Sequence, residues 1–303
     1  MKKVAFIIHG KLRTKEKLQQ QILQHFSEGY KVQFLITQQP GHSISLAKQA
    51  ALDGYTYIIC CGGDGSLNEC ANGIMQSGLA DKEEIKLGLL PGGSGNDFIK
   101  TIKSASTVQE LKNTIEHNKS KRIDLGLARF TSTDGKDTSR YFINITDVGM
   151  GGVAVERLNR TTKMFGAMAA YQYAIVTSLI SYKKHPITVT GDTFTCQGRM
   201  MNFFAANGAW LGSGLGVSPD SSLDDGLLNA IAIGDVSVMD YLKYLPDIRK
   251  GKKIIHPEVH YHTCKELTIQ SSVGPLPIDM DGEFVGYSPM KVKVIPAAIN
   301  FIV

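Results

Sequence analysis

The first 120 residues alternate between short apolar runs and longer amphipathic stretches. The apolar runs, each of strand length, cover residues 4–9, 31–37, 57–61 and 86–90. Stretches with helical spacing cover residues 15–28, 43–52 and 67–76. Leu18, Ile22, Leu23 and Phe26 share one face of the first stretch, and Ser43 is a suitable N-cap for the second. Strands that alternate with helices of this length predict an α/β domain with a parallel sheet flanked by helices.

The pattern changes after about residue 124. Short strand candidates joined by turn signals cover residues 140–148, 187–190, 199–206, 227–233, 266–270, 277–280 and 290–295. Helices are expected at residues 153–159, 164–182 and 238–249, and residues 132–139 are expected to form a polar hairpin tip. This pattern predicts an antiparallel, β-rich second domain.

Composition narrows the protein class without identifying a function. The chain has 303 residues, of which 43% are hydrophobic and 20% charged, so disordered, coiled-coil and fibrous proteins are excluded. The length fits two domains of about 100–200 residues each. The net charge of +5 permits attraction to anionic ligands or membrane surfaces but does not by itself predict nucleic-acid binding.

The cysteines and the apolar segments bear on the cellular compartment. The five cysteines show no zinc-ligand spacing, and Cys60 and Cys61 end an apolar run, so buried thiols in a reducing compartment are expected. The apolar stretch at residues 4–8 is shorter than the roughly 7–15 residues of a signal-peptide core. Residues 164–182 carry no charge but contain polar side chains, which predicts a buried or interfacial helix rather than a membrane span. A helix that lines an apolar cleft is the alternative.

A glycine-rich turn follows the third predicted strand directly. It reads Gly62-Gly63-Asp64-Gly65-Ser66 and leads into a helix. Successive glycines let backbone N–H groups approach an anion, and the helix N-terminus adds partial positive charge. Asp64 would repel a phosphate unless a divalent cation or a transferring proton lay between them, which suggests a magnesium–phosphate ligand. A plain strand-to-helix turn is the alternative, and this motif alone does not separate the two.

A second glycine-rich turn follows the next predicted strand, at residues 91–97. The carboxyl ends of neighbouring parallel strands meet at one crevice, where open α/β sheets bind ligands. We therefore expect the two turns to converge on a single site. Ser66 and Ser94 would supply hydroxyls there, and Asn96 and Asp97 an amide and a second carboxylate.

These motifs together resemble the diacylglycerol-kinase catalytic domain that bacterial diacylglycerol kinases share with sphingosine kinases, ceramide kinases and other lipid kinases. The resemblance rests on GGDGSLNE at residues 62–69 and LGLLPGGSGNDF at residues 87–98. It continues through NITDVGMGG at residues 144–152, the loop at residues 207–219, DGLL at residues 225–228 and IDMDGE at residues 278–283. The resemblance thus covers nearly the whole chain. Within the family, the chain resembles most specifically the soluble bacterial diacylglycerol kinase and its lipid-kinase relatives.

The resemblance implies an ATP-dependent lipid kinase. Such an enzyme transfers the γ-phosphoryl group of Mg-ATP to the hydroxyl of diacylglycerol, giving phosphatidic acid for phospholipid biosynthesis, or to a similar long-chain alcohol. The implied fold is an α/β ATP-binding domain, residues 1–124 plus 296–303, and a β-sandwich lipid-substrate domain, residues 125–295, with the last strand returning to the first domain. The resemblance also implies a cytoplasmic protein that contacts the membrane transiently at its surface. It implies no nucleic-acid partner, and it is compatible with a homodimer.

The resemblance assigns roles to individual residues. Asp64 would act beside Mg²⁺ and the γ-phosphate, and Asp97 would orient the acceptor hydroxyl or a metal-bound water. Glu283 would be the general base, supported by Asp281. The residues around the nucleotide would be His9, Gly10, Gly62, Gly63, Gly65, Ser66, Gly92, Gly93, Ser94 and Asn96.

The resemblance also implies a structural Mg²⁺ held by the Asp225 carboxylate and the Leu227 carbonyl. Asn229 stands where the family commonly has an acidic residue, which weakens a metal assignment at that residue. Asp225-Gly226 and Asp281-Gly282 are also ordinary hairpin-turn dipeptides.

Other positions depart from the family pattern or allow a simpler explanation. Ile8-His9-Gly10-Lys11 stands where many members have an Asn-Pro motif, and His9 is equally well explained as a partly exposed histidine. Ser66 and Ser94 replace a common Thr and keep its hydroxyl. Basic clusters at residues 183–185 and 249–253 could hold anionic lipid headgroups, although a solvated face is the commoner explanation.

Two other functions stay open from the sequence. NAD kinases and phosphofructokinases use similar Gly-Gly-Asp-Gly turns, so the acceptor could be a soluble molecule; the second turn and the late Asp-Gly-Glu argue against this. The other alternative is a relative that binds lipid or nucleotide without turnover. The presence of Asp64, Asp97 and Glu283 argues against it.

Overall fold

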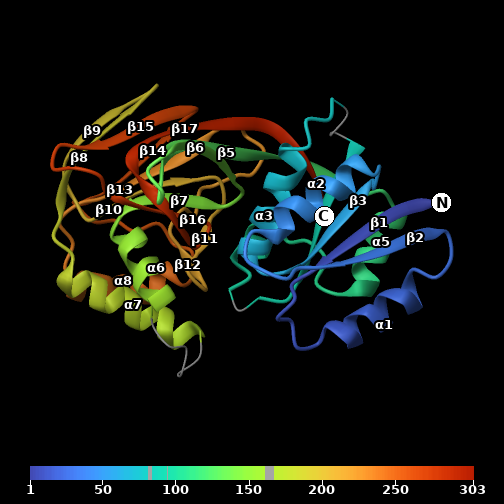
Figure 1. The fold of residues 1–303 in the computed structure, drawn as a ribbon. Helices are drawn as coiled ribbons and strands as arrows, with labels where there is room; N and C mark the ends of the chain where they lie inside the picture. Colours follow the sequence, from blue (N-terminus) through green and yellow to red (C-terminus); the bar gives the residue numbers. More distant parts are fainter. Residues whose placement is uncertain (81–83, 94, 161–166) are drawn as a thin grey trace. The chain divides into compact units, whose positions relative to one another are not determined.

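The computed structural model describes residues 1–80, 84–93, 95–160 and 167–303 (Figure 1). The chain forms two compact units. The first comprises Met1–Asp124 and Ala297–Val303, and the second comprises Leu125–Pro296. These bounds differ by one residue from the domains expected from the sequence, because Pro296 belongs to the second unit.

The first unit is built on a parallel sheet. Its strands are β1 (Lys2–Ile8), β2 (Tyr30–Ile36), β3 (Tyr57–Gly62) and β4 (Lys86–Pro91), in the order β2-β1-β3-β4. The end of β17 (Glu283–Ile302) adds a fifth strand, because Asn300 and Phe301 pair in parallel with the start of β4. The predicted α/β domain and the return of the last strand to it are therefore confirmed.

In the described part of this unit, the α-helices that connect and extend these strands are α1 (Lys15–His25), α2 (His42–Leu52), α3 (Asp64–Met75), α4 (Asp97–Ile102) and α5 (Val108–Glu116). Ile22 and Phe26 are buried beside the sheet, as the apolar face of the first helix predicts. Leu23 is 52% exposed, so its assignment to that face was wrong. Ser43 is not the N-cap of α2 either: Gly41 occupies that position, and the buried Ser43 donates its N–H to Glu69.

The second unit is an antiparallel sandwich. One layer has the strand order β14-β13-β10-β7-β16, and β17 pairs with β16 at one end and with β5 and β15 in the other layer. The strands of both layers are β5 (Ser120–Ser132), β6 (Asp137–Phe142), β7 (Ile145–Gly149), β8 (His185–Gly191), β9 (Thr195–Met200), β10 (Asn202–Ala206), β13 (Leu228–Ile233), β14 (Val259–Cys264), β15 (Glu266–Ser271) and β16 (Pro277–Met280). A separate ribbon pairs β11 (Trp210–Leu211) with β12 (Leu215–Gly216).

Several strand predictions for this unit need correction. The expected strand at residues 140–148 is two strands, β6 and β7, because the chain changes partner between them. The expected strand at residues 199–206 also divides, between β9 and β10, and β5 was not predicted. The helices among the described residues of this unit are α6 (Met150–Arg160), α7 (Ala167–Ser181) and α8 (Val238–Ile248). Residues 164–166 of the predicted uncharged helix lie outside the described residues.

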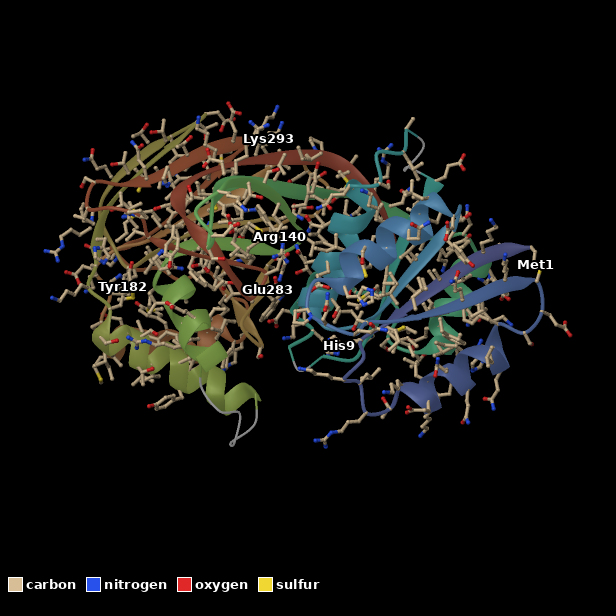
Figure 2. All side chains as sticks on the ribbon, in the orientation of Figure 1. Met1, His9, Arg140, Tyr182, Glu283 and Lys293 are labelled. Carbon is tan, nitrogen blue, oxygen red and sulfur yellow. The ribbon has the colours of Figure 1, made fainter. Side chains whose placement is uncertain are left out.

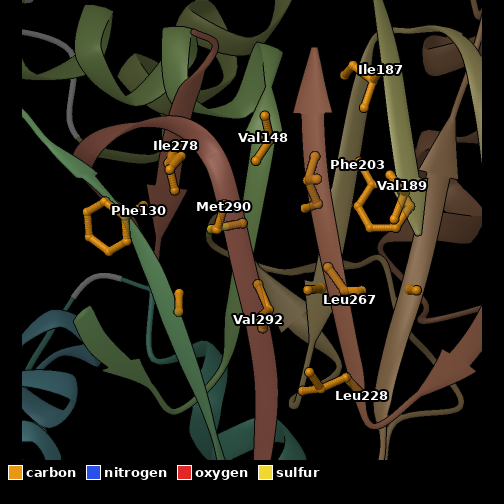
Figure 3. Close-up of a cluster of buried hydrophobic side chains, with 14 of the residues drawn as sticks. Phe130, Val148, Ile187, Val189, Phe203, Leu228, Leu267, Ile278, Met290 and Val292 are labelled. Carbon is orange, nitrogen blue, oxygen red and sulfur yellow. The ribbon is translucent and has the colours of Figure 1, made fainter. Parts of the chain in front are cut away.

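The interior of the sandwich is apolar and draws on both layers (Figure 3). Val148, Phe203 and Ile278 come from one layer and Val189, Leu267 and Val292 from the other, and all are buried. Burying one such side chain contributes roughly 1.5–3 kcal/mol, so this cluster is the main source of stability of the unit. None of the described helices is both long and apolar enough to cross a lipid bilayer.

Helices α6, α7 and α8 cover the opposite face of the β7-containing layer (Figure 1). Because side chains alternate along a strand, the neighbours of the core residues point to that face. Asp147 is the neighbour of Val148, Phe204 of Phe203, and Asp279 of Ile278. This layer is therefore buried on both faces, which is why its strands lack a simple apolar–polar alternation.

Candidate active site

The strand order of the first unit creates a ligand-binding position. The chain passes from β1 outward to β2 and then crosses back to β3 on the other side of β1. In open parallel sheets the crevice at such a reversal, outside the carboxyl ends of the strands, is where ligands bind. His9 and Gly10 follow β1 there, and Gly62 ends β3 beside them, with the His9 N–H donated to the Cys61 carbonyl.

The two glycine-rich turns meet at this edge. The N–H of Gly92 donates to the carbonyl of Gly62 at 2.8 Å. A Cβ atom on Gly93 would lie 2.5 Å from the Cα of Gly63, so a side chain there would force the two turns apart. A Cβ atom on Gly62 would lie 2.9 Å from Ser66, within the first turn itself. The convergence predicted from the sequence is therefore present. Gly92 and Gly93 remain exposed, and α3 begins at Asp64 with Gly63 as its N-cap.

Asp64 joins the two turns through its carboxylate. Its oxygens accept hydrogen bonds from the N–H groups of Asp97 and Phe98 at 2.9 and 3.0 Å. These donors begin α4, so Asp64 supplies acceptors for a helix end that would otherwise lack them. Burial raises the pKa of Asp64, and the two backbone hydrogen bonds oppose that rise. Asp64 thus positions the second turn, whatever else it does for a ligand.

The second turn is shaped by its own polar side chains. Asn96 adopts the left-handed conformation, with φ 49°, and its amide exchanges hydrogen bonds with the backbone of Gly93. Asp97 is buried and forms an ion pair with Lys100 at 2.6 Å. Ser94, one of the predicted nucleotide contacts, lies outside the described residues. Ser66 lies in the first turn of α3 and Gly65 precedes it.

The His9-Gly10 segment lies next to the first turn. His9 is exposed (Figure 2), so it is available to a ligand. Gly10 donates its N–H to the Thr37 hydroxyl, and a Cβ at Gly10 would lie 2.1 Å from the Thr37 carbonyl oxygen. The close approach of β1 and β2 at their ends explains this glycine without a ligand, and its predicted role at the nucleotide stays a prediction.

The Asp-Gly-Glu motif lies in the second unit, at the turn from β16 to β17. Asp281 and Gly282 both have positive φ, at 49° and 84°, and Met280 pairs with Glu283 across them, so the pair forms a tight hairpin turn. The Asp281 carboxylate accepts hydrogen bonds from the N–H groups of residues 143–145. Burial raises the pKa of Asp281 to about 6 despite these bonds. Its first role is therefore to fasten the start of β7.

Glu283 has a partner that the sequence reasoning missed. Arg140 of β6 forms an ion pair with it, with Nη2 and Oε2 2.7 Å apart (Figure 2). The Glu283 side chain remains 38% exposed. The ion pair therefore holds an accessible carboxylate in a fixed place, which suits a group that must meet a substrate hydroxyl.

The predicted structural metal site shows only a turn. Asp225 accepts a hydrogen bond from the N–H of Leu227, a local bond typical of aspartate turns. No group of three or more His, Cys, Asp or Glu side chains suited to a metal ion occurs among the described residues. The residues present do not form a protein-only Mg²⁺ cage, and a metal at Asp225 stays a prediction.

The second unit contains a large pocket between its helices and the outer face of the β7 layer. Its cavity volume is about 140 Å³, within a wider space that opens to solvent, and the described lining residues all belong to this unit. Most are apolar, among them Ile175, Leu179 and Ile231. The apolar character of this lining suits an apolar ligand.

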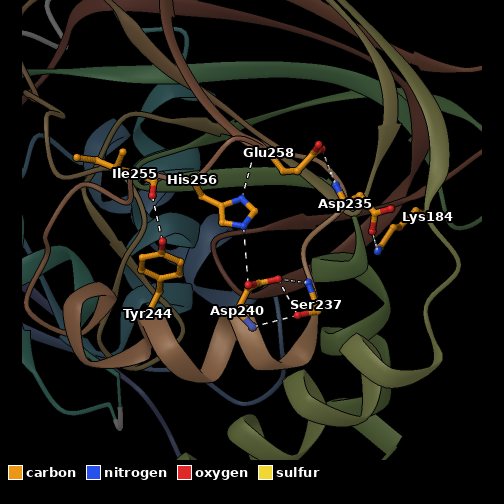
Figure 4. A network of polar contacts seen from close by, with 8 residues as sticks. All are labelled: Lys184, Asp235, Ser237, Asp240, Tyr244, Ile255, His256 and Glu258. Carbon is orange, nitrogen blue, oxygen red and sulfur yellow. Dashed lines mark hydrogen bonds and ion pairs between the residues drawn. The ribbon is translucent and has the colours of Figure 1, made fainter.

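Polar contacts at one wall of the pocket hold α8 in place (Figure 4). Ser237 and Asp240 form a capping box at the start of the helix. His256 lies 3.8 Å from Asp240 and accepts the N–H of Glu258. The Tyr244 hydroxyl donates to the carbonyl of Ile255. Because Asp240, Tyr244 and His256 also line the pocket, these contacts fix the position of its wall.

Two carboxyl groups are buried at this pocket. Asp147 on β7 and Asp279 on β16 are direct register partners, and they are 2% and 6% exposed. Burial raises the pKa of Asp147 to about 7, and burial together with the Asp147 charge raises the pKa of Asp279 well above its usual range. The sequence reasoning did not single out either residue. An aspartate within an otherwise apolar strand was the available signal.

These shifts predict that Asp147→Asn stabilises the second unit at neutral and alkaline pH. The folded pKa of about 7 lies above the ordinary value of 3.8, so the folded state binds the proton more tightly. Stability is therefore lost as pH rises from about 4 to about 7. At about 1.4 kcal/mol per pKa unit, Asn should raise the free energy of unfolding by up to roughly 4 kcal/mol above that window and little below it.

Urea unfolding at several pH values would measure the effect, with Asp137→Asn as the control, since Asp137 is an exposed residue of β6. An equal response of the two variants to pH would contradict the assignment of a buried, protonatable Asp147.

Two domain families match the chain. Residues 3–128 match the diacylglycerol kinase catalytic domain, and residues 144–303 match the YegS C-terminal NAD kinase beta sandwich-like domain. The two matches correspond to the two units and include the glycine-rich turns and the Asp-Gly-Glu turn.

Curated relatives match over nearly their whole length. A protein of Shewanella frigidimarina named "Probable lipid kinase YegS-like" is 24% identical over 299 residues, which are 99% of this chain and 93% of the relative. The diacylglycerol kinase of Staphylococcus carnosus is 27% identical over 293 residues, covering 95% of this chain and 91% of the relative.

Solved structures show the same fold. A diacylglycerol kinase structure from Bacillus anthracis has a TM-score of 0.72 at 20% identity and covers 99% of this chain and 96% of its own. Yeast NADH kinase in complex with NADH has a TM-score of 0.57 at 10% identity, covering 99% and 82%. The fold is thus shared by kinases with different acceptors. Taken with the family matches over both units, these findings show that the chain belongs to the family of diacylglycerol kinases and YegS-like lipid kinases.

Proposed function

We propose that the protein transfers the γ-phosphoryl group of ATP to the hydroxyl of diacylglycerol or a similar long-chain alcohol. The observation that carries this proposal is the apolar pocket of the second unit. Each methylene group of a lipid chain buried there contributes about 0.8 kcal/mol to binding. A dinucleotide or a sugar phosphate would instead place charged phosphates against Ile175, Leu179 and Ile231, and the described lining residues include no Lys or Arg.

The nucleotide would bind at the meeting point of the two glycine-rich turns. The exposed backbone of Gly92 and Gly93 and the N-terminus of α3 offer N–H donors and partial positive charge to phosphates. Mg²⁺ usually binds through one or two carboxylates together with nucleotide phosphates, so Asp64 and Asp97 could complete its shell only when the nucleotide is present. When bound, Mg²⁺ would neutralise charge that develops on the transferred phosphoryl group.

A lipid substrate also requires access to a membrane, and α8 has a surface suited to it. The exposed residues of α8 and of the two positions after it recur at helical spacing along one face and are Met239, Leu242, Lys243, Pro246, Arg249 and Lys250. The opposite face packs Tyr241, Leu245 and Ile248 beside the pocket. The exposed face is apolar at its start and basic at its end, which matches the surface of an anionic bilayer. Asp247 lies at the edge of this face, where it forms an ion pair with Lys252.

Helix α7 extends the same kind of surface. Tyr173 and Ile180 are 63% and 69% exposed and lie seven residues apart, on one side of the helix. Because α7 and α8 contact each other and both border the pocket, a bilayer docked on them would face the pocket wall. We therefore propose a transient peripheral contact between these helices and an anionic membrane.

The variant Met239→Glu/Leu242→Glu should bind vesicles rich in phosphatidylglycerol at least about tenfold more weakly than the wild type. The change removes two apolar side chains that would enter the interface and adds two negative charges that the surface repels. Vesicle co-sedimentation measures the effect. Val273→Glu is the matched control, since Val273 is 59% exposed at a turn away from α8. Equal loss in both variants, or none in either, would contradict the assigned surface.

The proposed reaction is tested by incubating the protein with Mg-ATP and diacylglycerol in detergent micelles. We expect phosphatidic acid, identified by mass spectrometry, together with an equal amount of ADP. A water-soluble short-chain diacylglycerol should react as well in the vesicle-binding variant as in the wild type, because that variant alters only membrane contact. ATP consumption without any phospholipid product would overturn the proposed acceptor.

A further inference from the structure

The apolar pocket has a polar patch made by Asp147, Asn202 and Asp279. All three line the pocket, and Asp147 and Asn202 are each only 2% exposed. They lie on adjacent strands, since Gly149 of β7 is the register partner of Asn202 and Phe204 is that of Asp147. Asp147 and Asn202 are therefore diagonal neighbours on the same face of the layer.

Two glycines make room for these polar side chains. A Cβ at Gly151 would lie 2.1 Å from Asp147 Oδ1, and one at Gly149 would lie 3.0 Å from Asn202 Oδ1. The glycines of this motif thus accommodate buried polar groups inside a greasy pocket. The buried polar patch therefore depends on glycine at positions 149 and 151.

The polar patch has hydrogen-bonding capacity left over. Asn202 Oδ1 accepts the N–H of Gly151 at 3.1 Å, which fixes the orientation of the amide. Asn202 Nδ2 and Asp147 Oδ1 are both buried and make no hydrogen bond of normal geometry in the described part of the chain, although the Asn202 amide acts on the Asp147 carboxylate and opposes the rise of its pKa that burial causes. Asp279 accepts the N–H of Gly282. An unmatched buried donor or acceptor costs about 1–3 kcal/mol, so a ligand that satisfied both atoms would gain accordingly.

We propose that Asp147 and Asn202 bind a hydroxyl group of the lipid inside this pocket. The inference rests on the proposed lipid-kinase function and narrows its substrate class to lipids that bring a hydroxyl to this point. A hydroxyl donates to Asp147 Oδ1 and accepts from Asn202 Nδ2, so it matches both atoms at once. An ammonium group would leave the Asn202 donor unmatched, because it has no acceptor. An ether oxygen would leave Asp147 unmatched, because it has no hydrogen to donate.

The fluorescence of the single tryptophan can report whether a ligand occupies the pocket in the full-length protein. The Trp210 ring lies 3.1 Å from where a Cβ of Gly216 would be, and Gly216 and Leu211 line the pocket. Fluorescence titrations without nucleotide would compare dodecan-1-ol with 1-methoxydodecane, which has the same chain but no hydroxyl hydrogen. The measured ratio is the dissociation constant of the ether divided by that of the alcohol. We expect this ratio to be about ten times larger in the wild type than in Asp147→Ala.

A matched variant separates polar recognition from apolar contact. Leu179→Ala removes an apolar side chain of the same pocket, so it should weaken both ligands and leave their ratio unchanged. Asp147→Leu keeps the branched heavy-atom connectivity of Asp, with two larger methyl groups in place of the oxygens, and serves if Asp147→Ala does not fold. It should lower the ratio as Asp147→Ala does.

An identical ratio in the wild type and the Asp147 variants would overturn the hydroxyl site, and so would tighter Asp147-dependent binding of dodecylamine than of dodecanol. Either result would leave phosphorylation of diacylglycerol unaffected. Loss of lipid phosphorylation with the ratio intact would instead overturn the proposed function and not the hydroxyl site.

Discussion

Asp64→Asn should lower kcat by about 10³-fold or more while the first unit remains folded. Asn keeps one side-chain oxygen, so the variant retains an acceptor for one of the two N–H groups that begin α4, while its NH₂ group replaces the other acceptor. The variant also loses the negative charge between the two glycine-rich turns. If that charge holds Mg²⁺ against the nucleotide phosphates, its removal takes away stabilisation of the transferred phosphoryl group. Steady-state kinetics with saturating Mg-ATP measure the loss.

Glu110→Ala is the matched control for Asp64. Glu110 also accepts backbone N–H groups at the start of a helix, as part of the α5 capping box in the same unit. Its removal should cost about 1 kcal/mol of stability and leave kcat unchanged. Equal activity of Asp64→Asn and the wild type would show that Asp64 only caps α4.

Glu283→Gln should lower kcat by about 10²–10⁴-fold, the range that a general base contributes. Gln preserves the shape of the side chain but cannot accept a proton from the substrate hydroxyl. It also cannot form the ion pair with Arg140, so the side chain would be less well held. The KM for ATP should stay near the wild-type value, since Glu283 is assigned to the acceptor and not to the nucleotide.

Glu266→Gln is the control for Glu283, because Glu266 is an exposed residue at the start of β15 in the same unit. Arg140→Lys tests the positioning role separately: it retains the charge but loses the guanidinium geometry, and it should lower kcat less than Glu283→Gln does. Full activity of Glu283→Gln would exclude the general-base assignment.

The local pattern of the sequence predicts the first unit well because its strands and helices alternate in chain order. Parallel strands also place their carboxyl ends together, so the meeting of residues 62–66 and 91–97 follows from local motifs. The return of β17 to β4 was expected from the family resemblance. It could not be derived from periodicity, because the pairing joins residues more than 200 positions apart.

The second unit exposes the limits of local reasoning. Buried on both faces, β7 and β10 lack the alternation that marks a half-buried strand, and the break between β6 and β7 depends on which partners each strand meets. Arg140 could be assigned to Glu283 only from the paired strands. The expected support of Glu283 by Asp281 stays a prediction, and the hydrogen bonds of the Asp281 carboxylate to residues 143–145 were not indicated by the local pattern.

The sequence offered an apolar cleft lined by residues 164–182 only as an alternative, and Ile175 and Leu179 of that segment do line the pocket. The uncharged stretch at residues 164–182 suggested a buried or interfacial helix, and Ala174, Ile175 and Leu179 of α7 are indeed buried while Tyr173 and Ile180 are exposed. Which helices would cover which face of the sandwich depends on tertiary packing. The buried Asp147 became meaningful only when Asn202 and Asp279 were found beside it.

The most direct test of the whole account is a competition among acceptors. The protein would be given ATP with a radiolabelled γ-phosphate, Mg²⁺ and an equimolar mixture of diacylglycerol micelles, NAD⁺ and fructose 6-phosphate. We predict that label enters the organic phase as phosphatidic acid, and that Asp64→Asn and Glu283→Gln abolish this transfer. Label recovered in NADP⁺ or in a sugar bisphosphate, with none in the lipid, would contradict the account.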